Sequence, residues 1–252
     1  MPVGGDCEKP HFLLTWKDLA LNGEVFGEIS KMLYETEQIK MTSLNLMPVA
    51  EKISQHLARV EKARDTSYIL HREIIKKSGL AIRAVHRGDQ QLTDSIIAEA
   101  RESLVQATQT IEHFDELAIT GFVHDAQKEY VEACATAAIV FNRELPDPDS
   151  LGVSYSAYLK GLSEVIGELR REILDLMRQD RGDLGEEYLQ AMEEIYSMLV
   201  TMDFSDAVTA GLRRSTDQAR GILERTRGDF TNHIVSRRIR NDLKKYAQVP
   251  TA

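Results

Sequence analysis

Cysteine is scarce in this chain of 252 residues, in which Cys7 and Cys134 stand far apart. Two isolated cysteines exclude a disulfide framework and a CxxC metal site, and this pattern is typical of a reducing cytoplasm. The sequence has no apolar run near the roughly 18 residues that a membrane span requires, and its first residues lack the basic and apolar regions of a secretory signal. We therefore expect a cytoplasmic protein without a membrane partner.

Proline and aromatic residues are also few, with 6 prolines and 6% Phe, Trp and Tyr. Such a composition favours helices over sheets, and no strand-like alternation of apolar residues is present. The 42% of hydrophobic residues suffices for a large core. The net charge of −9 excludes general attraction to nucleic acid, so any such binding must use a local basic patch.

Apolar residues at three- and four-residue steps predict an all-α fold, a bundle of seven helices. Three Arg-Gly-Asp tripeptides, which begin at Arg87, Arg181 and Arg227, fall between predicted helices and are interpreted as helix stop and start signals. The predicted helices cover approximately residues 48–83, 90–114, 122–143, 154–178, 186–200, 205–226 and 229–245. We predict an N-terminal extension over residues 1–44, a helical domain over residues 45–246 and a tail over residues 247–252.

Two of these helices carry paired carboxylates within otherwise apolar patterns. Glu129 and Glu132 are three residues apart, and Glu164 and Glu168 are four residues apart, so each pair shares one helix face. The short loop at residues 146–150 predicts that the two helices are antiparallel neighbours, which would bring the four carboxylates together. Such a cluster is repulsive unless a cation or shared protons neutralise it. Clustered oxygen ligands suit Mg²⁺ or Mn²⁺.

A solvated surface is the alternative interpretation of each pair, because 40 acidic residues produce close pairs by chance. This alternative is weaker for Glu132, which precedes an alanine-rich run where an unpartnered carboxylate is costly. Gly161 precedes the second pair, Gly167 lies within it, and both indicate close backbone approach or room for a ligand. A ferritin-like di-iron site is excluded because these helices lack Glu-x-x-His pairs. The sequence also lacks a nucleophile elbow and a phosphate-binding glycine loop.

The long first helix carries many cations. Arg64, Arg72 and Lys76 are candidate contacts to a nucleic-acid backbone, and a solvated helix face is the alternative for each. His124, five residues before Glu129, is either a phosphate contact or a capping or surface histidine.

The predicted fifth and sixth helices carry more apolar residues than one core face needs. We expect this surplus to be buried between subunits of a closed homo-oligomer. The residues concerned are Leu189, Met192, Ile195, Met198, Leu199 and Phe204.

The sequence around the paired carboxylates resembles the Translin/Trax family, and it is more similar to Trax and its archaeal relatives than to translin. The resemblance covers roughly residues 50–243. It is carried by KEYVEA at residues 128–133, by GL at 161–162, by GELRR at 167–171, and by RD at 64–65, LRR at 212–214 and AR at 219–220.

The resemblance implies a seven-helix bundle of the translin type that assembles into a closed octameric shell around RNA. It matches Glu129, Glu132 and Glu168 with catalytic, metal-binding glutamates of Trax, whereas Glu164 stands where the family has an aspartate. The implied activity is a Mg²⁺-dependent endonuclease, with Mn²⁺ as an alternative to Mg²⁺ and Glu164 or Glu168 as the base. The implied partners are single-stranded RNA or DNA, further copies of the chain and, as an alternative, a translin-like second subunit. His124 lies near a histidine of the nucleic-acid-binding stretch of translin.

Two other functions remain open at this point. A non-catalytic, translin-like shell would bind single strands without cutting them, although an uncompensated acidic cluster repels phosphate. An all-α Mg²⁺-dependent nucleotide pyrophosphohydrolase would also use Glu-x-x-Glu helices, but it would need no long basic track.

Overall fold

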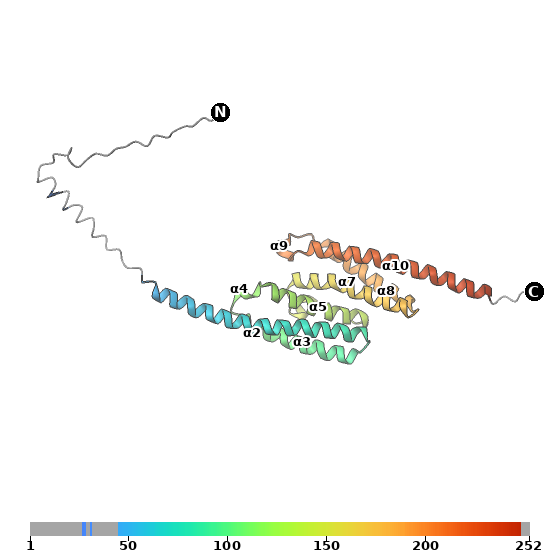
Figure 1. Cartoon of the computed structure of the whole chain (residues 1–252), viewed down its shortest axis with the longest axis horizontal. Helices are drawn as coiled ribbons and strands as arrows, with labels where there is room; N and C mark the ends of the chain where they lie inside the picture. Colours follow the sequence, from blue (N-terminus) through green and yellow to red (C-terminus); the bar gives the residue numbers. More distant parts are fainter. Residues whose placement is uncertain (1–26, 29–30, 32–44, 248–252) are drawn as a thin grey trace, which may run out of the picture. The chain divides into compact units, whose positions relative to one another are not determined.

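The computed structural model describes residues 27–28, 31 and 45–247, and the regular structure within them is entirely helical (Figure 1). The predicted all-α class is thereby confirmed. The chain divides into two compact units, residues 1–53 and 54–252. The elements are α2 (Met47–His86), α3 (Gln90–Ile111), α4 (Asp115–Ala118), α5 (Gly121–Val140), α6 (Pro148–Leu151), α7 (Tyr155–Arg178), the 3-10 helix η1 (Gly182–Leu184), α8 (Gly185–Thr201), α9 (Asp206–Thr209) and α10 (Leu212–Ala247).

The first unit is described at residues 27–28 and 31, which are helical, and at residues 45–53, where α2 begins. Most of the predicted N-terminal extension, including Cys7, and residues 248–252 of the predicted tail lie outside the described residues. The domain boundaries therefore stay a prediction. Within the described ranges, each helix is too short or too polar to cross a membrane.

Two of the three Arg-Gly-Asp tripeptides separate helices, as predicted. Gly88 ends α2 with a φ of 71°, in the left-handed region that glycine tolerates. The Asp89 carboxylate accepts a hydrogen bond of 3.0 Å from the backbone N–H of Leu92 and so caps α3. The second tripeptide leads into η1, which separates α7 from α8.

The third tripeptide lies inside α10, so the predicted sixth and seventh helices are mostly one continuous helix. Gly228 costs helix stability, on the order of 1 kcal/mol relative to alanine. Contacts to other helices hold the segment in place, because Arg170 donates to Asp229 at 2.8 Å and Arg227 donates to Glu193 at 2.6 Å. Phe230 is buried against α7 and α8. Tertiary packing thus outweighs the local break signal.

Helix α7 lies at the centre of the second unit, where it packs against α5, α8 and α10. Helices α5 and α7 run in the same direction (Figure 1). Near the start of both, Gln127 accepts a hydrogen bond of 3.1 Å from the backbone N–H of Ser154, and further along, Val131 meets Gly161. The predicted antiparallel orientation is therefore wrong. The chain returns along the bundle through residues 141–154, which contain α6, before α7 begins.

The apolar surplus predicted for the fifth helix is mostly core of the same chain. Leu189, Met192, Ile195 and Leu199 are buried in a cluster with α7 and α10. The prediction failed because α8 packs against two helices, so a wide apolar stripe is needed within one subunit. Met198 is half-buried against the same cluster, and Phe204 is 65% exposed.

Candidate metal and nucleic-acid site

Three of the predicted carboxylates gather between α5 and α7. Glu129 and Glu132 come from α5 and Glu164 comes from α7, and one oxygen of each lies within 4.8 Å of the other two. Glu132 is buried, with 8% of the residue exposed, whereas Glu129 and Glu164 are half-buried. The parallel helices therefore place the Glu-x-x-Glu face of α5 against the first glutamate of α7.

The environment of Glu132 disfavours its charge. Burial raises the pKa of Glu132, and the nearby carboxylates of Glu164, Glu129 and Glu168 raise it further, to about 8. Lys128 opposes this effect but does not cancel it. A further cation beside Glu132 would therefore favour its ionised form.

Lys128 is the cation that the chain itself places in this cluster. Its Nζ donates to Glu164 Oε1 at 2.8 Å and lies 3.1 Å from Glu129 Oε1. Burial lowers the pKa of Lys128, but the hydrogen bonds and charges of Glu164 and Glu129 outweigh burial and raise it. Lys128 is therefore charged at neutral pH and neutralises part of the cluster.

Glu168 lies next to this group, close enough to raise the pKa of Glu132, but its carboxylate is held by a histidine. His86 Nε2 is 2.5 Å from Glu168 Oε2, and His86 Nδ1 is 2.5 Å from Glu172 Oε1. Burial opposes the charge of His86, but the hydrogen bonds to these two glutamates raise its pKa to about 9. The hydrogen bond from His86 also lowers the pKa of Glu168. A charged imidazole thus bridges α2 and α7 beside the cluster.

Sequence reasoning missed His86 and Glu172. The available signal was the position of His86 in the last turn of α2, where a basic side chain also complements the helix dipole. The pairing of His86 with α7 depends on how α2 packs, which no local sequence pattern indicates.

The predicted nucleic-acid contacts lie on two elements. Arg64, Arg72 and Lys76 are exposed on α2, and Arg64 pairs with its neighbour Asp65 at 3.0 Å. Arg72 and Lys76 line a hollow of about 930 Å³ that also includes the first turns of α5. In the described part of the chain, no hydrogen bond or ion pair joins these three residues to the carboxylate cluster.

His124 lies one turn before Lys128 on α5. Burial lowers the pKa of His124, and the positive charge of Lys160 on α7 lowers it further. Its Nε2 is buried and has no hydrogen-bond partner among the described residues. His124 and Lys160 therefore mark the end of the cluster that is nearer to the starts of both helices.

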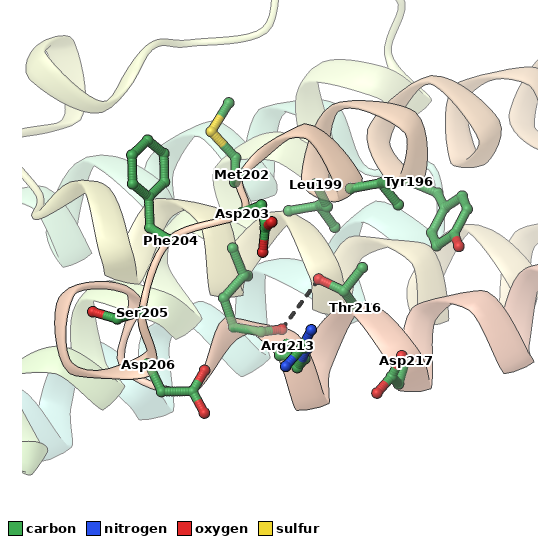
Figure 2. Close-up of a pocket in the computed structure, with 12 residues that line it drawn as sticks. Tyr196, Leu199, Met202, Asp203, Phe204, Ser205, Asp206, Arg213, Thr216 and Asp217 are labelled. Carbon is green, nitrogen blue, oxygen red and sulfur yellow. Dashed lines mark hydrogen bonds between the residues drawn. The ribbon is translucent and has the colours of Figure 1, made fainter.

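A second hollow, of about 670 Å³, lies at α8, α9 and the start of α10 (Figure 2). The Thr216 hydroxyl donates to the Leu212 carbonyl of its own helix at 3.1 Å and so leaves little donor capacity for a ligand. The charged residues that line the hollow are Asp203, Asp206, Asp217 and Arg213. This acidic balance repels phosphate, and none of the predicted site residues lines the hollow.

No family model matches the chain. An uncharacterized protein of Methanocaldococcus jannaschii is 33% identical over 195 residues, which are 75% of this chain and 85% of that protein. Among solved structures, AfC3PO is 29% identical with a TM-score of 0.69 over 75% of this chain and 98% of that chain. The structure of AfC3PO in complex with duplex RNA is 28% identical with a TM-score of 0.65. The match covers 75% of this chain and 97% of that chain. Apo-NeC3PO, at 18% identity and a TM-score of 0.67 over 74% and 98%, shares the fold.

Fold and structural neighbours together define an all-α protein of the C3PO type, in which a carboxylate cluster lies between two central helices. The chain belongs to the Translin/Trax family.

Proposed function

We propose that this protein is a Mg²⁺-dependent endonuclease that binds and cleaves RNA, with single-stranded DNA as a further substrate. The observation that carries the proposal is the convergence of Glu129, Glu132 and Glu164, one oxygen of each within 4.8 Å of the others. A solved structure of the similar protein AfC3PO contains duplex RNA, which supports RNA as the polymer.

The donor set fits a hard divalent cation. The three clustered side chains offer carboxylate oxygens, and burial together with the neighbouring carboxylates raises the pKa of Glu132. Oxygen ligands of this kind suit Mg²⁺, with Mn²⁺ as a second candidate. When bound, the cation would polarise a phosphodiester and lower the pKa of a water molecule.

The glutamates of the cluster have different proposed roles. Glu129, Glu132 and Glu164 would hold the cation, and burial of Glu132 keeps bulk water from one side of it. Glu168 is the fourth proposed ligand, and it stays ionised at neutral pH because His86 lowers its pKa. Glu168 and Glu164 are the two candidates for the general base.

Basic side chains would hold the polymer. Arg64, Arg72 and Lys76 on α2 are proposed contacts to successive phosphates, and His124 is a proposed contact nearer to the cluster. Because the net charge is −9, such binding depends on these local cations and is expected to weaken steeply with salt.

We further propose that the protein works as a closed homo-oligomer, most simply an octamer, in the cytoplasm. The octamer follows from the family resemblance. Exposed apolar side chains near the end of α8 and in α9 could form a subunit contact. These are Val200, Phe204 and Val208. A shell with an acidic exterior and inward basic faces would reconcile the negative net charge with RNA binding.

The direct test is incubation of purified protein with labelled single-stranded and duplex RNA, in Mg²⁺ and in EDTA. We expect cleavage in Mg²⁺ and none in EDTA. Glu129→Gln and Glu132→Gln remove charge with little change of shape and are expected to lose cleavage while remaining folded. Glu102→Gln, on the exposed surface of α3, is the matched control.

The same experiment separates the rival functions. Binding of RNA without cleavage in Mg²⁺ would favour a non-catalytic shell. Hydrolysis of nucleoside triphosphates without cleavage of RNA would favour the pyrophosphohydrolase. Cleavage by Glu132→Gln at the wild-type rate would show that the site is elsewhere.

A further inference from the structure

Lys128 is more buried than a lysine on a helix surface usually is. Its side chain is 16% exposed, and its Nζ lies between carboxylates of two helices, 2.8 Å from Glu164 Oε1 and 3.1 Å from Glu129 Oε1. Both carboxylates belong to the group that could hold a metal ion. The ammonium and a divalent cation would therefore compete for the same two carboxylates.

We propose that Lys128 is a displaceable counter-ion, which neutralises Glu129 and Glu164 in the metal-free protein and moves to a substrate phosphate when a divalent cation takes them. This inference rests on the proposed function and adds to it a coupling between metal binding and RNA binding.

Lys128 and a divalent cation cannot favourably bind the carboxylates of Glu129 and Glu164 at the same time. The ammonium has donors and no acceptor, so it contacts the cluster only through the carboxylate oxygens that a cation needs. A divalent cation next to it would also repel it, and this repulsion is strong where burial limits screening by water. Glu164, which accepts the shorter of the two hydrogen bonds, has to release Lys128 before it can serve as a full ligand.

The flexible stem of lysine allows a second position for Nζ. Towards the starts of α5 and α7, the neighbouring groups are His124 and Lys160, and the positive charges of Lys160 and Lys128 both lower the pKa of His124. The buried Nε2 of His124 has no hydrogen-bond partner among the described residues, so its hydrogen-bonding capacity is unused. Lys128, Lys160 and His124 together would suit a phosphate adjacent to the one being cleaved. The polymer, rather than a free nucleotide, provides such a second phosphodiester.

The test measures metal binding directly, with Mn²⁺ as the probe and calorimetry as the readout. Lys128→Met keeps the apolar stem and removes the competitor, so we expect Mn²⁺ to bind at least about tenfold more tightly than to the wild type. Lys128→Arg places a guanidinium that can bind carboxylates in bidentate fashion and should weaken Mn²⁺ binding. Lys62→Met, an exposed position on α2, is the control and should match the wild type.

The second arm measures affinity for labelled RNA by fluorescence anisotropy, with and without Ca²⁺. In the wild type we expect Ca²⁺ to tighten RNA binding severalfold, and in Lys128→Met this gain should largely disappear. Unchanged or weaker Mn²⁺ binding by Lys128→Met, with a native circular dichroism spectrum, would overturn the inference. If neither the wild type nor Lys128→Met binds Mn²⁺, the proposed metal site itself is absent. Mn²⁺ binding with no RNA cleavage would refute the nuclease function but leave the role of Lys128 standing.

Discussion

Replacement of Glu132 by glutamine is expected to stabilise the metal-free protein, although it should abolish activity. The pKa of Glu132 is raised from 4.5 to about 8 by burial and by the neighbouring carboxylates. An acid whose pKa is raised on folding contributes stability below its unfolded pKa and loses that contribution as the pH rises through the folded pKa. The wild type should therefore lose stability between about pH 4.5 and pH 8, and Glu132→Gln should not lose this part.

The expected magnitude follows from the two pKa values. One pKa unit corresponds to about 1.4 kcal/mol. The difference between 4.5 and about 8 thus gives Glu132→Gln an advantage on the order of 5 kcal/mol above pH 8. At pH 7 the advantage is on the order of 3 kcal/mol, and near pH 4 it should vanish because the carboxyl group is then neutral in both states.

Urea unfolding followed by circular dichroism in EDTA, at a fixed protein concentration, measures this difference at pH 5, 7 and 9. The free energy of unfolding of Glu102→Gln, on the exposed face of α3, should differ from that of the wild type by the same amount at each pH. A gap between Glu132→Gln and the wild type that does not grow with pH would refute the buried acidic environment. Mg²⁺ should stabilise the wild type more than Glu132→Gln, because a ligand that binds only the folded state adds to its stability.

Three further predictions concern the surroundings of the cluster. His86→Gln should destabilise the protein by up to about 3 kcal/mol below pH 6.5, and the loss should fade as the pH rises through about 9, because the folded pKa of His86 is raised; denaturation at pH 6 and pH 10 measures it. Gly161→Ala should cost about 1–3 kcal/mol, since its Cβ would lie 2.7 Å from Val131 Cβ, whereas Gly167→Ala, with nothing within 4 Å, should be neutral or stabilising in the same denaturation assay. Light scattering during size exclusion should give a mass of several subunits, and a particle near 28.5 kDa at micromolar concentration would exclude the shell.

Most helices were predictable because each has a wide apolar stripe and clear stop signals. Gly88 and Asp89 end and cap helices through local chemistry that needs no tertiary partner. Gly228 failed as a stop signal because Arg170 and Glu193 hold the residues beside it from other helices. Gly228 differs from Gly88 in the long-range contacts of its neighbours, and a local sequence pattern does not reveal such contacts.

The acidic half of the site was predictable, and its cationic half was not. Spacing on one helix face identified Glu129 and Glu132, because an i, i+3 relation survives any packing of the bundle. Lys128 and His86 enter the site through neighbours 36 and 82 residues away, Glu164 and Glu168. Such pairs follow from the parallel packing of α5 and α7 and from the point at which α2 ends.

That parallel orientation also gives Gly161 a part in positioning the cluster. A 20-residue helix is about 30 Å long. Residues 141–154 are enough to return that distance even though they include the short helix α6, since an extended chain spans up to about 3.3–3.6 Å per residue. The two helices approach each other closely where Gly161 faces Val131 and the Lys128 carbonyl. Glu132 follows Val131 directly, and Glu164 lies about one turn beyond Gly161, so the distance between their carboxylates depends on this contact. A side chain at position 161 would separate the helices at the point where their carboxylates have to share one cation.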